Sequence, residues 1–147
     1  MTSQEAAYLA GFFDGEGCVG AYITNRPASP TNRAARGMRL SVSVAQVDRR
    51  PLLMLQEAFG GAVVVSDKGN TRKDGFNRRI CYVWIVSGPS AQTALRAMLP
   101  YLVVKREQAE EALKIVMIPR GARRRTEYRD EDVRIASHIK ELKRKAG

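Results

Sequence analysis

The stretch that decides the fold is Leu9-Ala10-Gly11-Phe12-Phe13-Asp14-Gly15-Glu16-Gly17, near the start of a chain of 147 residues. Apolar residues at helical spacing predict a helix over about residues 4–14, with Ser3 as its N-terminal cap. Gly15 and Gly17 are expected to end this helix, because glycine favours the conformations found just after a helix. The stretch therefore predicts a helix followed by a sharp change of direction.

One side of this helix carries small residues at four-residue spacing, which places them in a single stripe: Ala7, Gly11 and Gly15. A glycine in a helix costs about 1 kcal/mol relative to alanine, so the stripe indicates the close approach of another backbone. Since the chain contains one such helix, the expected partner is the same helix of a second subunit across a two-fold axis.

Asp14 and Glu16 are placed at the C-terminal end of the helix, where the helix dipole disfavours negative charge. In a symmetric pair of these helices, the two Glu16 carboxylates would also repel each other. A hard divalent cation with oxygen ligands, Mg²⁺ above all, removes both costs and supplies a Lewis acid for phosphodiester hydrolysis. The alternative is an acidic surface turn between two glycines.

The composition fits a folded domain with an anionic partner. Apolar residues make up 44% of the chain and charged residues 27%, and the net charge is +10 with a pI near 10.1. This charge favours a nucleic acid, because neutralised phosphates release condensed counterions. An anionic membrane surface is the alternative partner. Against this basic background, residues 1–20 contain three acids and no base.

Several classes of protein are excluded by what the chain lacks. We expect neither a membrane span, which needs roughly 20 apolar residues in a row, nor a secretory signal, and so no membrane partner. Cys18 and Cys81 are the only cysteines and His138 is the only histidine, which excludes zinc sites and Ser/His or Cys/His nucleophiles. Two reduced thiols indicate an intracellular protein of the cytoplasm, the nucleoid or an organelle.

The rest of the chain alternates between strand-like and helical patterns. Period-two alternation predicts four strands, over residues 18–26, 38–46, 62–66 and 79–87. Helical spacing predicts four more helices, over about residues 48–59, 90–99, 105–118 and 130–145. This order fits the α+β class, with a four-stranded antiparallel sheet and helices on one face. We divide the chain into a domain over residues 1–119 and a basic extension over residues 120–147, helical from about 130.

The uncovered face of the predicted sheet is polar and basic, with side chains of one parity: Tyr22, Arg26, Arg39, Ser41, Ser43 and Arg79. An antiparallel ribbon of this kind can enter the major groove of DNA. A sheet face that is merely solvated is the alternative.

The nonapeptide resembles the signature of the LAGLIDADG homing endonuclease family. Two phenylalanines occupy the large apolar positions of that signature, and Glu16 occupies the position of the metal-binding acid. Two further segments look like parts of the same family: Gly60-Gly61-Ala62-Val63, a turn into the third strand, and Leu99 to Lys105, a helix break that ends in lysine. The resemblance covers roughly residues 5–118.

This resemblance implies an αββαββα fold, in which the saddle-shaped sheets of two subunits straddle one DNA duplex. Because no second copy of the motif follows Gly17, it implies the single-motif, homodimeric type that acts on a long near-palindromic target. Glu16 and the carbonyl of Gly15 are the implied ligands of Mg²⁺ or Mn²⁺. The implied reaction is site-specific hydrolysis of both DNA strands.

The resemblance also implies roles for other residues near the helix end. Gln46 aligns with a polar residue that orients water around the scissile phosphate. Arg49 or Arg50 is expected to contact that phosphate, with a plain helix-start residue as the alternative for Arg50. Lys105 matches an active-site lysine that stabilises developing phosphate charge, a solvated lysine being the alternative. Asp14 is expected to brace the helix junction rather than to bind metal.

For DNA contacts we expect the polar face of the sheet to read bases through Tyr22, Thr24, Arg26, Arg39, Ser41, Ser43 and Arg79. Three basic residues of the predicted hairpin tip are expected on phosphates: Lys68, Arg72 and Lys73. The basic extension is interpreted as an amphipathic helix docked through Ile135, Ile139 and Leu142. Its alternatives are an RNA-binding appendage and a disordered arm.

The sequence thus predicts a Mg²⁺-dependent DNA endonuclease that acts as a homodimer on double-stranded DNA. One alternative is a relative that binds without cutting, such as an RNA maturase that helps an intron RNA to fold. Another is a basic architectural or ribosome-associated protein. Binding alone requires none of Glu16, Gln46 and Lys105, so their joint presence favours the nuclease.

Overall fold

The computed structural model describes residues 1–31, 35–67, 79–117 and 129–146. In chain order, its elements are α1 (Ser3–Glu16), β1 (Gly17–Arg26), β2 (Ala35–Gln46), α2 (Arg49–Phe59), β3 (Ala62–Asp67), β4 (Cys81–Ser87), α3 (Pro89–Met98), the 3₁₀ turn η1 (Leu99–Tyr101), α4 (Arg106–Leu113) and α5 (Asp130–Ala146). The predicted α+β class with a four-stranded antiparallel sheet is confirmed. The predicted hairpin residues Lys68, Arg72 and Lys73 lie outside the described residues.

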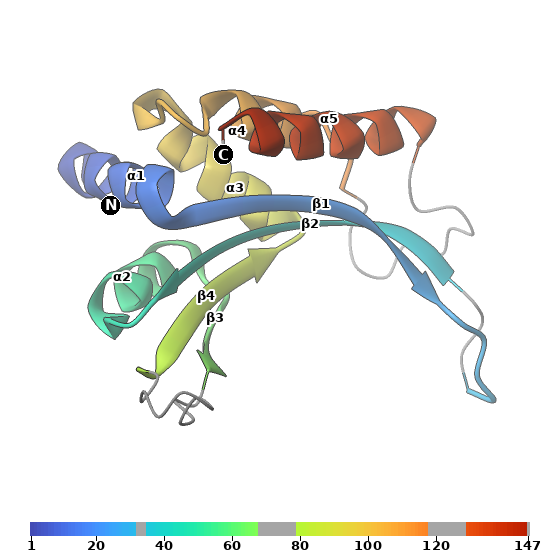
Figure 1. Cartoon of the computed structure of the whole chain (residues 1–147), viewed down its shortest axis with the longest axis horizontal. Helices are drawn as coiled ribbons and strands as arrows, with labels where there is room; N and C mark the ends of the chain where they lie inside the picture. Colours follow the sequence, from blue (N-terminus) through green and yellow to red (C-terminus); the bar gives the residue numbers. More distant parts are fainter. Residues whose placement is uncertain (32–34, 68–78, 118–128, 147) are drawn as a thin grey trace, which may run out of the picture.

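The strands form one sheet in the order β1-β2-β4-β3, and every neighbouring pair is antiparallel. The helices pack against one face of this sheet, and the other face is concave and open (Figure 1). Val19, Val42 and Trp84 point from the strands into the core and are fully buried. Phe13 of α1 packs in the same core. The shared core therefore fixes α1 to the sheet and leaves the concave face free.

The first helix is longer than the sequence predicts. Its N-terminal cap is Thr2 rather than Ser3, within a capping box. The helix also continues through Gly15, which we expected to end it, and finishes at Glu16. The glycine penalty of about 1 kcal/mol is too small to end the helix there, because the fully buried Phe13 anchors its last turn. Glu16 consequently belongs to the final turn of α1.

The last strand begins later than predicted. β4 starts at Cys81, so Arg79 lies outside the sheet and its assignment to a strand is wrong. The pairing of β3 with β4 is irregular between Val65 and Asp67, and this bulge lets the ladder end at the Asp67–Cys81 pair. Trp84 is buried as predicted, and its indole N–H donates a hydrogen bond of 2.8 Å to a carbonyl of the glycine turn before β3.

The helix α4 ends at Leu113, earlier than the predicted end near residue 118. The buried side chain of Gln92 on α3 accounts for this difference. Its amide nitrogen donates to the carbonyl of Ala112 at 3.3 Å and to that of Ile115 at 2.7 Å. These bonds satisfy carbonyl groups that a continuing helix would otherwise use, and they hold α3 against α4.

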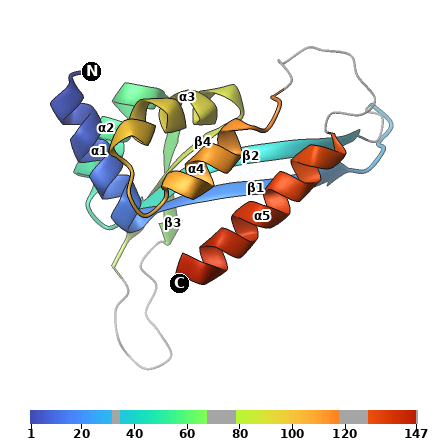
Figure 2. The same cartoon turned by 90° about the horizontal axis from the view of Figure 1, so that it is seen from above.

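The helix α5 docks on the rest of the molecule, which confirms the predicted amphipathic helix. Ile135 and Ile139 are buried in the same hydrophobic cluster as the sheet, and Leu142 is half-buried. From above, α5 runs diagonally across β1 (Figure 2). The division into residues 1–119 and 120–147 stays a prediction. Among the described helices, none has the length and apolar character needed to cross a bilayer.

An ion pair between the half-exposed Arg129 and the buried Asp132 holds the start of α5. The carboxylate of Asp132 accepts a hydrogen bond from the Arg129 guanidinium at 3.0 Å and one from the Val116 backbone N–H at 3.4 Å. Burial raises the pKa of Asp132, but the hydrogen bonds from Arg129 and Val116 outweigh it, so the pKa lies below its usual value. The ionised form of Asp132 therefore stabilises the docked helix.

Candidate active site and nucleic-acid interface

Asp14, in the last turn of α1, binds the loop that leads into α4. Its carboxylate accepts hydrogen bonds from the backbone N–H groups of Val103 at 2.6 Å, Val104 at 3.2 Å and Lys105 at 2.9 Å. Three donors occupy most of the acceptor capacity of this carboxylate. The expectation that Asp14 braces the helix junction is confirmed.

The side chain of Lys105 is directed at the same helix end. Its ammonium group donates to the backbone carbonyl of Asp14 and lies 6.0 Å from the centre of the Phe13 ring. A cation is favourable here, because the C-terminal end of a helix carries partial negative charge. An ammonium group has three N–H donors, so two remain for a phosphate oxygen or for water. Lys105 is thus held beside the tip of α1, and two of its N–H donors remain for another partner.

The side chain of Glu16 differs from that of Asp14 in its exposure and in its partners. Its side chain is exposed, and it forms no hydrogen bond or ion pair with the part of the chain that the structure describes. The neighbouring Gly15 is also exposed, and its carbonyl is among the last carbonyls of α1, which lack a partner within the helix. Glu16 and Gly15 therefore offer a carboxylate and a carbonyl oxygen that have no partner in the described chain.

These two oxygens fit a hard divalent cation, because carboxylates and carbonyls are the ligands that Mg²⁺ and Ca²⁺ prefer. Over residues 1–31, 35–67, 79–117 and 129–146, no three His, Cys, Asp or Glu side chains gather into a metal cluster. One subunit thus offers part of a coordination shell, and further ligands would come from DNA, water or a second subunit.

Gln46 lies beside the tip of α1. The sheet register pairs Gly17 with Val44, and β2 runs two residues further, so its end reaches the junction of α1 and β1. The side-chain oxygen of Gln46 accepts a hydrogen bond of 2.8 Å from the backbone N–H of Val47. This bond orients the amide group, which still has two N–H donors.

Arg49 and Arg50, at the start of α2, both have partners within the chain. The Arg50 guanidinium nitrogen Nε lies 3.1 and 3.0 Å from the two carboxylate oxygens of Asp48. Hydrogen bonds from the side chain and then the backbone of Arg50 lower the pKa of Asp48 to about 2. The Arg49 guanidinium lies over the Tyr82 ring, 5.0 Å from its centre. Arg50 thus pairs with Asp48 at the start of the helix, and its contact with a phosphate stays a prediction.

A cavity of about 330 Å³ beside the tip of α1 contains side chains that the sequence analysis missed. Asp14, Gly15 and Lys105 line it together with Cys18 and with Lys143 of α5. The Lys143 ammonium lies 3.0 Å from the Cys18 sulfur, although 125 positions separate the two residues. The docking of α5 across β1 brings them together (Figure 2), and no spacing in the sequence could have indicated it.

The small residues of α1 form an exposed stripe. Ala7, Gly11 and Gly15 are all exposed, and a methyl group added to either glycine would meet no atom of the described chain within 4 Å. Packing within the chain therefore does not require these glycines. Tyr8 beside them is 51% exposed, whereas Leu9 is buried. α1 thus carries small and apolar residues on its outer side as well as its core side, as expected for a helix covered from two directions.

The concave face carries the predicted polar residues over β1 and the adjoining part of β2. Tyr22 and Arg39 are cross-strand neighbours and both are exposed, as is Arg26. Ser41 and Ser43 share this face and are half-buried, and the Thr24 hydroxyl donates to a β2 carbonyl at 3.2 Å. Exposed donors and cations on an open concave surface fit a polyanionic partner.

Toward β3 and β4 the same concave face is apolar, which the sequence analysis did not predict. The register pairs Ser43 with Ile85 and Ala45 with Val83, and on the next strand Ala62 with Ile85 and Val64 with Val83. We call these side chains the apolar patch: Ala45, Ala62, Val64, Val83 and Ile85. Their neighbours in sequence, such as Trp84, point into the core.

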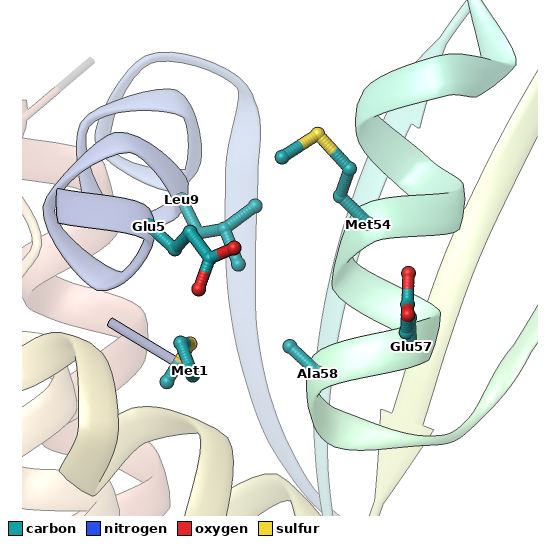
Figure 3. A pocket seen from close by; sticks show the side chains of 6 residues that line it. All are labelled: Met1, Glu5, Leu9, Met54, Glu57 and Ala58. Atoms are coloured by element: carbon teal, nitrogen blue, oxygen red, sulfur yellow. The ribbon is translucent and has the colours of Figure 1, made fainter. Parts of the chain in front are cut away.

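A second groove, of about 390 Å³, lies between α1 and α2 (Figure 3). Its lining is apolar and acidic and comprises Met1, Glu5, Leu9, Met54, Glu57 and Ala58. Hydrogen bonds from the backbone and side chain of Thr2 lower the pKa of Glu5. None of these residues is a candidate catalytic residue, and the two acids of this groove would repel a phosphate. The tip of α1 is therefore a better candidate active site than this groove.

Comparison with known proteins agrees with this geometry. No model of a protein family matches the chain. The DNA endonuclease I-CvuI of Chlorella vulgaris is 36% identical over 112 residues, which are 75% of this chain and 62% of the relative. The crystal structure of the homing endonuclease I-CvuI with its target and Ca is 34% identical, covers 76% of this chain and 64% of that one, and has a TM-score of 0.56. The chain is therefore similar in sequence and in fold to a homing endonuclease, as the resemblance of the nonapeptide implies.

A more distant structure supports the same fold. The archaeal intron-encoded homing endonuclease I-Vdi141I, complexed with DNA, is 16% identical, and the match covers 95% of this chain and 97% of that one with a TM-score of 0.51. This likeness includes nearly the whole chain, and it concerns the fold alone. The chain spans about three fifths of the length of its curated relative I-CvuI.

Proposed function

We propose that the chain is a site-specific, divalent-metal-dependent DNA endonuclease that works as a homodimer and cuts both strands. The observation that carries the proposal is the difference between the two acids at the α1 tip, Asp14 and Glu16. Asp14 is committed to three backbone N–H groups, whereas Glu16 is exposed and has no partner in the described chain, two residues beyond the Asp14 carbonyl that Lys105 binds. The relative I-CvuI is a DNA endonuclease, and its crystal structures contain DNA targets with Ca or Mg.

In this proposal each side chain near the α1 tip has a separate role in phosphodiester hydrolysis. Glu16 and the Gly15 carbonyl would hold Mg²⁺ or Mn²⁺, which would supply Lewis acidity toward a phosphate oxygen and toward water. Lys105 donates to the negative charge that develops on the scissile phosphate, where a fixed cation stabilises the transition state most. Gln46 orients water at the same phosphate, and Arg49 and Arg50 neutralise phosphates beside it.

A homodimer follows from the number of acids and from the outer side of α1. One chain presents one unshared acid at its tip, and two antiparallel DNA strands call for two. The stripe of Ala7, Gly11 and Gly15 lets two copies of α1 approach closely. Sedimentation should give about twice the 16.3 kDa chain mass for the native protein, and single chains for Gly11→Leu.

The concave face is the proposed DNA surface. Its polar part reads base edges through Tyr22, Thr24, Arg26, Arg39, Ser41 and Ser43, since arginine and hydroxyl groups match donors and acceptors of the major groove. Phosphate contacts are assigned to Arg49, Lys68, Arg72 and Lys73, which carry no base information but fix the register. Arg79 was expected to read a base, but it lies outside the sheet and is assigned to a phosphate instead. The partner is therefore double-stranded DNA.

The experiment is selection of bound duplexes from a random library, followed by incubation of the enriched duplex with Mg²⁺. We expect one enriched near-palindromic site, cut in both strands by the native protein and bound but left intact by Glu16→Gln. Calorimetric titration should show that divalent-ion binding disappears in Glu16→Gln. Binding of the site without cutting by the native protein would instead identify a non-cleaving relative, and the absence of any enriched duplex would point to an RNA partner.

A further inference from the structure

The apolar patch is a continuous surface of the concave face. Ala45, Val83 and Val64 stand side by side across β2, β4 and β3, because the register pairs Ala45 with Val83 and Val83 with Val64. Ile85 and Ala62 form the next row. Val64 is 48% exposed, Ala45 and Ala62 are exposed, and the other two are half-buried. Five apolar side chains thus face outward with no described element covering them.

Strand formation does not explain this composition. Threonine is β-branched like valine and also favours strands, and at an exposed position it would present a hydroxyl group to solvent. On the other half of the same face the outward positions are polar, as Tyr22, Arg39 and Ser41 show. The change from polar to apolar falls within one continuous sheet face, so a single partner would meet both halves.

The major groove of DNA offers one apolar group, the 5-methyl of thymine. Apolar side chains cannot satisfy the major-groove donors and acceptors of either kind of base pair, and a G·C pair offers no apolar group to offset that loss. Against a thymine methyl, the same side chains exclude water from apolar surface on both partners. The chemistry of the apolar patch therefore selects among base pairs.

We propose that the apolar patch reads thymine methyl groups, so that the base pairs opposite Ala45, Val64 and Val83 are A·T or T·A. This inference rests on the proposed function, since it assumes that DNA lies on the concave face. The polar half of the face reads its base pairs by hydrogen bonds, and each half-site combines both modes. In a homodimer the thymine-rich block recurs at symmetric positions on the two sides of the centre.

Site selection with a matched pair of variants tests the proposal. Val64→Arg places a guanine-reading side chain within the apolar patch. Val65→Arg makes the same change one residue further along β3, where the side chain is similarly exposed at 51% but pairs with Tyr82 on the other face of the sheet. We expect Val64→Arg to change the selected pair at one position per half-site to G·C, and Val65→Arg to leave the native site unchanged.

Replacement of thymine by uracil in the selected duplex then isolates the methyl group. For the native protein we expect about a fourfold loss of affinity for each methyl removed from the block, and no loss for thymines elsewhere. A native site without an A·T block, a uracil duplex bound as tightly as the thymine duplex, or a specificity change in Val65→Arg alone would overturn the proposal while leaving the endonuclease assignment intact. If no duplex is enriched, the endonuclease assignment itself fails.

Discussion

Two acids in the last turn of α1 are expected to have different effects when each is replaced. Loss of Asp14 should lower the stability of the fold, and loss of Glu16 should lower the rate of DNA cleavage. Asp14→Ala removes the acceptor of three backbone N–H groups at the start of α4. Glu16→Ala removes an exposed carboxylate with no partner in the described chain. Comparison of the two variants therefore separates a structural acid from a catalytic one.

The magnitude for Asp14→Ala follows from its contacts. A hydrogen bond to a charged group contributes about 1.5–3 kcal/mol, and the partly buried bond from the Lys105 N–H falls in this range. The bonds from Val103 and Val104 are exposed, so water replaces them and each contributes about 0.5 kcal/mol. The free energy of unfolding should fall by about 2.5–4 kcal/mol, which lowers Tm by about 8–13 °C.

Urea denaturation and DNA cleavage, measured on the same preparations, decide the matter. Glu16→Ala should change the free energy of unfolding by less than about 0.5 kcal/mol, because the side chain is exposed and the helix dipole disfavours it. Its cleavage rate should fall by at least about 100-fold. The reasoning is refuted if Asp14→Ala and Glu16→Ala are equally stable, or if Glu16→Ala cuts at close to the native rate.

Three further predictions concern other parts of the molecule. Lys143→Gln should slow cleavage by about tenfold through loss of a cation from the cavity at the α1 tip, measured against Lys140→Gln on the same helix, which should cut at the native rate. Asp132→Asn should destabilise the chain at pH 7 by about 1–3 kcal/mol in urea denaturation. Because the folded pKa of Asp132 is lowered, this difference from the native chain should shrink as the pH falls below about 4, where the unfolded carboxylate takes up its proton. Gly61→Ala should lower Tm by several degrees in a thermal melt, since its φ is +83° and the added Cβ would lie 2.4 Å from the Ile85 carbonyl oxygen.

Much of the architecture could be predicted because periodic burial controls it. Alternation along β1 and β2 correctly separated the core residue Val42 from the outward residues Tyr22 and Ser41. Helical spacing located α1 and the docked face of α5, with Ile139 buried. These patterns are local in sequence, so composition and spacing are enough to find them.

The element ends that were wrong depend on contacts between distant residues. α1 passes through Gly15 because Phe13 is anchored in the core. α4 ends early because Gln92 of another helix binds one carbonyl of its last turn and the Ile115 carbonyl just beyond it. Arg79 falls outside β4 because a bulge in β3 shifts the pairing at Asp67. Each of these outcomes requires knowledge of a neighbour that sequence spacing does not reveal.

The residues of the candidate site show the same difference: some could be predicted from the sequence, and others depend on contacts between distant segments. The resemblance supplied the separate roles of Asp14 and Glu16, and it also supplied Gln46 and Lys105. Lys143 was missed, since it reaches the α1 tip only through the docking of α5. The apolar patch was missed because valine in a strand is expected in the core, and its outward direction emerges from the register of three strands.

The most direct test of the central claim is disulfide capture between two copies of α1. Gly11→Cys, in a chain whose native cysteines are serine, places one thiol per subunit at the expected point of closest approach, and a disulfide requires the two Cα atoms to lie within about 7 Å. Mild oxidation should give a covalent dimer that still cuts DNA, whereas Ser137→Cys on the exposed side of α5 should remain monomeric under the same conditions. If Gly11→Cys forms a covalent dimer no faster than Ser137→Cys, the paired helices, and with them the two acidic tips on one duplex, are contradicted.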